Sequence, residues 1–176
     1  MRIRLVLVAA LAVPGLTGCS RFISEGKGAV TGASGQFVDI QSIGGETALS
    51  EFGRIEFEPV MSDVGDVVPP LVLTSIRQET LERLAEKGYF TGPGPVLTLS
   101  GRVTHYEKGG GADAALDPLQ QVIMRVEARD GATLLGIANV TGRSTSLSSS
   151  GRRNLAKGCA KGIVKWLKQY TPSDKQ

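Results

Sequence analysis

A single histidine and a serine-rich stretch are the residues of this sequence that could support covalent catalysis. His105 is the only histidine, and serines cluster over residues 144–150. Together with Asp113 or Asp117, they supply the residue types of a serine hydrolase triad. However, the serines lie in no Gly-x-Ser-x-Gly motif, and no spacing brings the three residue types together. We therefore predict that His105 is a partly exposed residue at a strand end and that the chain is not an enzyme.

Cysteine is the other residue type with redox or metal-binding chemistry, and the chain contains two, Cys19 and Cys159. Cys159 lies between Leu155 and Ile163 at helical spacing, which predicts a small, buried, apolar residue. The alternatives are a reactive thiol or an intermolecular disulfide. One histidine and one thiol on a core stripe do not make a typical zinc site, so we predict neither a metal nor a dissociable cofactor. Trp166 is likewise predicted to be a core residue.

A basic stripe near the C-terminus is the candidate binding surface. From residue 143 onward the chain carries eight Lys or Arg and one acid, whereas residues 19–142 carry ten basic and sixteen acidic residues. Such a stripe suits anionic lipid headgroups, lipopolysaccharide phosphates or an acidic protein face. The alternatives are a solvated helix face, or one that complements the acidic half of the same chain. The stripe consists of residues at every fourth position: Arg153, Lys157, Lys161 and Lys165.

The N-terminus has the parts of a secretory signal. Two arginines among the first four residues precede an apolar run over residues 5–13, which a Pro-Gly pair ends. A run of this length is too short to cross a bilayer, which favours a signal peptide over a membrane helix. The four residues that follow resemble the bacterial lipobox: Leu16, Thr17, Gly18 and Cys19.

The lipobox resemblance implies a signal peptide over residues 1–18, cleavage before Cys19, and a covalent lipid on the Cys19 thiol. Several acyl chains on one cysteine hold a protein firmly at a membrane. Ser20 stands where an Asp would favour retention in the inner membrane of a Gram-negative bacterium. The resemblance therefore implies that, in a bacterium with two membranes, the protein is anchored in the inner leaflet of the outer membrane and faces the periplasm. In a bacterium with a single membrane, it implies anchoring in the cell membrane.

The rest of the chain divides into a tether, one domain and a tail. Residues 19–35 are rich in Gly, Ser and Ala with little periodicity, which predicts a lipidated flexible tether. Residues 36–170 are long enough for a single periplasmic domain with its own core, and residues 171–176 form a C-terminal tail.

Hydrophobic patterning predicts the elements of this domain. Period-two alternation indicates strands over residues 36–43, 54–59, 96–106, 121–129 and 132–142, with a loop over 61–68. Helical periodicity indicates helices over residues 71–87 and 152–170, and Gly88 is a natural C-terminal cap. Asp130-Gly131 predicts a tight hairpin turn. This order predicts an α+β two-layer sandwich, a mainly antiparallel sheet with two main helices packed on one face.

Three short segments carry a second resemblance: KGYF at residues 87–90, LTLSGRV at 97–103 and RDG at 129–131. With the order of elements, they look like small envelope lipoproteins whose domain is similar to the N-terminal domain of TolB. Penicillin-binding-protein activators and curli secretion lipoproteins share that domain. The resemblance implies a role in binding or assembly, and it assigns no functional residue.

We therefore predict a membrane-anchored periplasmic lipoprotein that acts as a non-enzymatic binding or assembly component of the cell envelope. Its expected partners are the membrane, through the lipid, and an envelope protein, but not nucleic acid. The alternative is a carrier of lipid or a small ligand for an envelope transport system, which would require an apolar cavity between helices and sheet.

Overall fold

The computed structural model describes residues 32–108, 120–144 and 150–171. In chain order, the helices and strands of these residues are β1 (Ala33–Gln41), β2 (Arg54–Phe57), β3 (Met61–Ser62), the 3-10 turn η1 (Gly65–Val67), α1 (Pro70–Glu86), β4 (Val96–Glu107), β5 (Gln120–Asp130), β6 (Thr133–Ser144) and α2 (Ser150–Lys168).

The strands form one mixed sheet in the order β1-β6-β5-β4-β2, and β3 also pairs with β4. The pairs β1–β6, β5–β6 and β4–β5 are antiparallel, while β2 and β3 run parallel to β4. The predicted hairpin is confirmed, although its turn lies one residue later than predicted. Asp130 pairs with Thr133, so Gly131 and Ala132 make the turn, and Gly131 takes the left-handed conformation that a tight turn needs.

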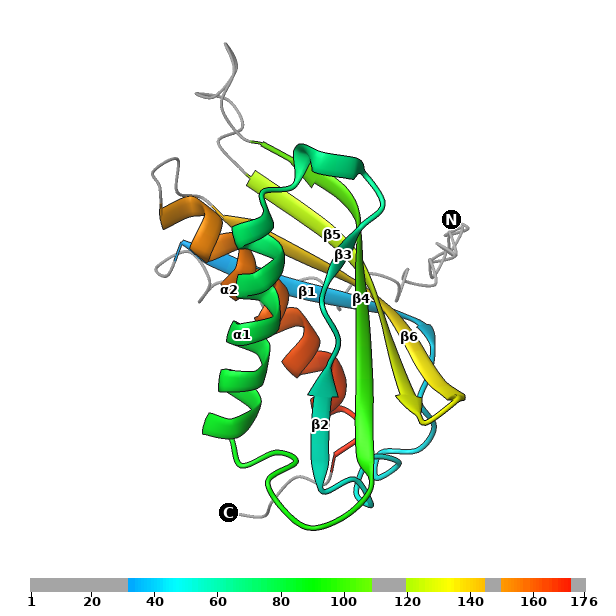
Figure 1. Cartoon of the computed structure of the whole chain (residues 1–176). Coiled ribbons are helices and arrows are strands. Elements are labelled where there is room, and N and C mark those ends of the chain that lie inside the picture. Colours follow the sequence, from blue (N-terminus) through cyan, green and yellow to red (C-terminus); the bar gives the residue numbers. More distant parts are fainter. Residues whose placement is uncertain (1–31, 109–119, 145–149, 172–176) are drawn as a thin grey trace, which may run out of the picture.

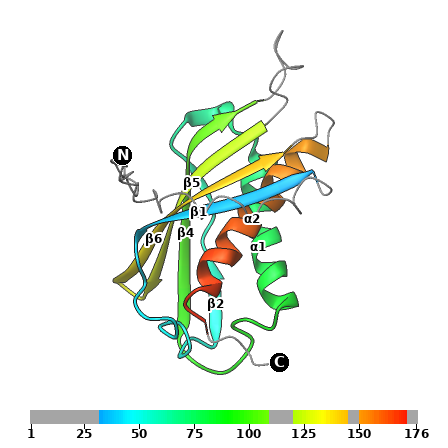
Figure 2. The same ribbon diagram turned by 180° about the vertical axis from the view of Figure 1, so that it is seen from behind.

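Both helices lie on the same side of the sheet (Figure 1), and seen from behind, α2 runs beside β1 (Figure 2). The predicted fold class, an α+β two-layer sandwich, is therefore confirmed. The core lies between the sheet and the helices. Apolar side chains at alternate positions of β4 and β5 point into it, and so does the apolar stripe of α2. Cys159 and Trp166 are buried there, as predicted. The other buried side chains of these three elements include Leu97, Leu99, Val103, Val122, Met124, Val126, Ala128, Leu155, Ile163 and Leu167, and Tyr170 follows α2.

Local sequence signals account for the ends of α1. Pro70 occupies the first helical position, where its missing N–H costs nothing. At the other end Gly88 is left-handed, its N–H bonds the Ala85 carbonyl, and the Tyr89 N–H bonds the Leu84 carbonyl. This pair of bonds is the Schellman motif, so the predicted glycine cap is confirmed.

Glycines let α2 cross the sheet at backbone contact. A Cβ on Gly35 of β1 would lie 1.9 Å from the carbonyl oxygen of Gly158 in α2. A Cβ on Gly142 of β6 would lie 2.6 Å from the Cys159 amide nitrogen, and one on Gly162 would lie 2.7 Å from the Gln36 carbonyl oxygen. Side chains at these positions would force the two layers apart. At this crossing the backbones of the two layers are in direct contact.

Two segments differ from the sequence prediction. The sheet begins at Ala33, three residues before the predicted start of the domain at 36, because residues 33–35 pair with β6. Their small side chains, typical of a linker, are what the close approach of α2 requires. The predicted loop over 61–68 contains β3 and η1, since Met61 and Ser62 continue the edge of the sheet beside Arg102 and Val103.

Candidate functional site

Several predicted features lie outside the described residues. These are the lipobox with Cys19, most of the predicted tether, Asp113, Asp117 and the serines between residues 145 and 149.

The described members of the hydrolase hypothesis do not come together. His105 is exposed on β4, beside an irregularity in the pairing with β5. Ser144 is fully buried on β6, and β5 lies between these two strands. In the same described ranges, no group of three or more His, Cys, Asp or Glu could hold a metal ion.

Cys159 is buried in the core, as its spacing predicted. Burial raises the pKa of its thiol from an ordinary value of 9.0 to about 12. The thiolate is the nucleophilic form, so this side chain is unreactive in the folded protein.

The basic stripe is partly engaged with the protein's own sheet. The Nζ atoms of Lys161 and Lys165 each donate a 2.9 Å hydrogen bond to a carbonyl oxygen of β1, at Ala33 and Gly35 respectively. Desolvation lowers the pKa of Lys161, and the nearby charges of Arg83, Lys165 and Lys157 lower it further. Two members of the stripe, Lys161 and Lys165, therefore lie against β1, and the charges of Lys157 and of Arg83 of α1 act on Lys161.

Trp166 is a core residue with a specific polar partner that sequence reasoning missed. Its indole Nε1 donates a 2.6 Å hydrogen bond to Oδ1 of Asp39, and the Tyr170 hydroxyl donates to Oδ2 at 3.0 Å. Ser42 Oγ lies 3.2 Å from the same hydroxyl. Burial and the Asp39 carboxylate raise the pKa of Tyr170, against an opposing effect of Ser42. Asp39 thus ties the C-terminal end of α2 to β1.

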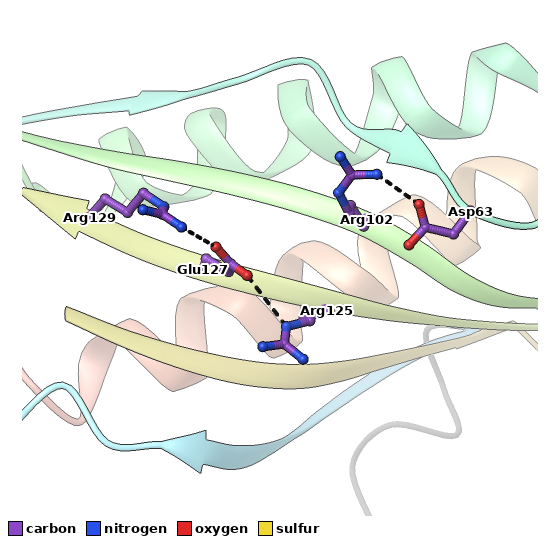
Figure 3. Close-up of polar contacts among 5 residues, drawn as sticks. All are labelled: Asp63, Arg102, Arg125, Glu127 and Arg129. Atoms are coloured by element: carbon purple, nitrogen blue, oxygen red, sulfur yellow. Dashed lines mark hydrogen bonds and ion pairs between the residues drawn. The ribbon is translucent and has the colours of Figure 1, made fainter. Parts of the chain in front are cut away.

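The side of the sheet opposite the helices, here called the open face, carries a group of charged residues. Figure 3 shows five of them projecting away from the helices. Arg102 of β4 donates to Asp63 at 2.8 Å. On β5, Glu127 accepts from Arg129 at 2.8 Å and forms an ion pair with Arg125 at 3.4 Å.

Arginine predominates in this group, and its guanidinium groups stay accessible. Arg102 and Arg125 are directly opposite each other across β4 and β5, an arrangement of like charges that usually costs stability. Their side chains are 60% and 45% exposed, and that of Arg129 is 37% exposed. Each acid occupies only part of a guanidinium fork, so donors remain available for carboxylates or phosphates of a partner.

The open face was not among the predicted sites, although the alternation carried a signal. Residues 125, 127 and 129 are the polar positions of a strand whose other positions are apolar, which places them together on the solvent side. Pairing of β4 with β5, which brings Arg102 beside Arg125, is a long-range contact that the alternation does not specify.

Comparison with known proteins establishes the fold only. No family model matches the chain, and no curated protein matches its sequence. Among solved structures, PelC dodecamers from Paraburkholderia phytofirmans match in two crystal forms. In each, the identity is 16%, the TM-score is 0.50, and the match covers 80% of this chain and 99% of the PelC chain.

No helix among the described residues has the length and apolar character needed to cross a membrane.

Proposed function

We propose that this chain is a lipid-anchored component of the bacterial envelope that works by binding and assembly, without chemistry of its own. Cys19 carries the lipid, and the folded domain presents its open face to an envelope protein. The single observation on which this proposal rests is the asymmetry of the sheet, with one face closed by two helices and the other bearing exposed arginines.

The accessible donors of Arg102, Arg125 and Arg129 suit a partner that offers carboxylates or phosphates. Their direct neighbours, Asp63 and Glu127, hold the guanidinium groups in position before a partner arrives. Preorganisation of this kind reduces the entropy lost on binding.

The shared fold supports an assembly role. The matching PelC structures are dodecamers, so this arrangement of helices and sheet is compatible with self-association in those proteins. The anchor and the periplasmic location follow from the lipobox resemblance and remain part of the proposal.

Two experiments test the proposal. In cells given labelled palmitate, the wild-type chain should incorporate lipid and the Cys19→Ser variant should not. In-cell crosslinking followed by purification should recover an envelope protein with the wild type and lose it when Arg102 and Arg125 are both changed to Glu. Lys87→Glu, an exposed charge reversal after α1, is the matched control and should retain the partner. A wild-type chain without lipid, or capture unaffected by the double reversal, contradicts the proposal.

A further inference from the structure

The basic stripe on α2 is the binding surface predicted from the sequence that the proposed function does not use. From Gly151 to the end of α2, every apolar residue is buried, and the side chains with access to solvent are polar. The sequence of the helix contains six basic residues and no acidic residue. The accessible side chains are Arg152, Asn154, Lys168 and the four members of the stripe, Arg153, Lys157, Lys161 and Lys165. Apart from one asparagine, the accessible side of α2 is therefore cationic.

Acids on the neighbouring elements do not cancel this charge. The charged groups that lower the pKa of Lys161, after the larger effect of desolvation, are all cations: Arg83 of α1, Lys165 and Lys157. Glu79 of α1 pairs with Arg83 at 3.9 Å, and both oxygens of the Asp39 carboxylate on β1 accept hydrogen bonds from aromatic side chains. Even with both acids counted in full, these four cations and two acids leave a net charge of +2.

The length of the stripe suits a row of phosphate groups better than a single anion. Its members follow one another at every fourth residue of a helix, so the row from Arg153 to Lys165 is about 18 Å long. One phosphate group can contact only neighbouring members of such a row, whereas the headgroups of several lipids form a continuous anionic surface. Each Lys or Arg near such a surface strengthens attachment about fivefold.

The stripe also lies next to the point where the folded domain connects to the proposed lipid anchor. The Lys161 ammonium donates to the carbonyl oxygen of Ala33, the first residue of β1, and α2 runs beside this strand (Figure 2). Ala33 follows Cys19 by fourteen positions, which span at most about 50 Å when fully extended. Attachment at this point gives the stripe a high effective concentration of lipid headgroups, an advantage that a separate acidic protein does not have.

We propose that the basic stripe binds the phosphate groups of anionic phospholipids in the membrane that holds the anchor, so that the helices of the domain lie toward that membrane. The inference deepens the proposed function and rests on its lipid anchor. The helices cover one side of the sheet and the charged residues of the open face project from the other (Figures 1 and 3). Docking through α2 therefore turns the open face away from the membrane and leaves it accessible to a partner.

Energy transfer from Trp166 to a dansyl-labelled headgroup lipid tests this orientation, because Trp166 is the only tryptophan and follows Lys165 on α2. The full lipidated chain is reconstituted in vesicles of phosphatidylcholine alone, and in vesicles of equal parts phosphatidylcholine and phosphatidylglycerol. Transfer should be greater in the anionic vesicles, and concentrated sodium chloride should abolish the difference by screening. Inorganic phosphate at the same ionic strength should act no more strongly than chloride. Selective displacement by phosphate would indicate a site for a single anion and contradict a lipid surface.

A double substitution removes charge from the stripe without touching its contacts with β1. Arg153→Gln combined with Lys157→Gln leaves the lysines bonded to β1 in place and should weaken docking in anionic vesicles about 25-fold, since each lost cation costs about fivefold. Arg54→Gln combined with Lys87→Gln removes the same charge from exposed positions on β2 and after α1, and is the matched control. The control should dock like the wild type. Circular dichroism establishes that both variants are folded.

Equal transfer in the two kinds of vesicle overturns the inference, as does a stripe variant that docks like the wild type. If the control variant loses docking to the same extent as the stripe variant, the attraction depends on total charge and the assignment to α2 is wrong. The palmitate experiment tests the anchor separately. A chain that carries lipid but shows equal transfer fails this inference alone, whereas a chain without lipid fails the proposed function.

Discussion

Replacing Gly158 with alanine should destabilise the domain, because α2 meets β1 at this point without room for a side chain. The new Cβ would lie 2.5 Å from the Ser34 carbonyl oxygen and 3.0 Å from the Arg143 amide nitrogen. Ordinary contact begins at 3.4 Å, so helix and strand must separate by about 0.9 Å at the closer atom. Both contacts are to backbone atoms, which cannot rotate away as the end of a side chain can.

The expected magnitude follows from two opposing effects. Overpacking of a core costs up to about 3 kcal/mol when backbone must move. Alanine is favoured over glycine inside a helix by about 1 kcal/mol. The free energy of unfolding should therefore fall by about 2 kcal/mol, which for a urea m-value of about 2 kcal/mol/M lowers the midpoint by about 1 M.

Urea unfolding followed by the fluorescence of Trp166, the only tryptophan, measures this change. Gly45→Ala is the matched control, since a Cβ there would meet nothing within 4 Å. It should leave stability unchanged or raise it by about 0.5 kcal/mol, because alanine restricts the unfolded chain. A Gly158→Ala variant as stable as the wild type would refute the idea that the crossing depends on backbone contact.

Three further predictions concern the core and its borders. Asp39→Ala should lower the free energy of unfolding by about 2–3 kcal/mol, measured in urea, because the buried Trp166 N–H loses its acceptor; Asp39→Asn, which keeps an acceptor oxygen, should cost less. Burial in the folded state favours the neutral Cys159 thiol, whereas the thiol of the unfolded chain ionises near pH 9.0. The free energy of unfolding is therefore unaffected by this group below pH 9.0 and falls as the pH rises from 9.0 towards the folded pKa of about 12. Cys159→Ala should flatten the fall of unfolding free energy over that interval, and an unchanged slope would contradict the assignment. Gly88→Ala should cost about 1 kcal/mol, measured by thermal unfolding, because the residue must hold a positive φ.

The buried side of each helix and strand was predictable from the sequence, because the spacing of apolar residues along a segment determines which side chains share a face. Leu97 and Leu99 of β4, and Leu155 and Ile163 of α2, are buried as their spacing indicated. Burial of these apolar side chains depends on their own spacing and needs no knowledge of the partner element.

The contacts that define the candidate site were less accessible to sequence reasoning. Gly35 belongs to a segment rich in Gly and Ala. Small residues are typical of a flexible linker, and they are also what a close contact between a helix and a strand requires, so the composition does not distinguish the two. Asp39 finds Trp166 only after β1 has paired with β6 and α2 has packed on both strands. Arg102 joins Arg125 only through the β4–β5 register. Such pairings depend on the whole fold, since the residues involved are far apart along the chain.

The position of β1 has a consequence for the order of folding. β1 is the first of the strands to leave the ribosome, yet its Ala33 pairs with Ser144, near the end of β6. Lys165, whose ammonium bonds the Gly35 carbonyl, is made later still. β5 and β6 need only a two-residue turn to meet, whereas closing the loop between β1 and β6 is slow. Until synthesis is nearly complete, Val38 and Ile40 travel on an unpaired strand, which is a template for aggregation. Chaperones that shield nascent chains would therefore be needed most at the beginning of this sequence, and the quenching or shift of Trp166 fluorescence should be among the last signals of refolding.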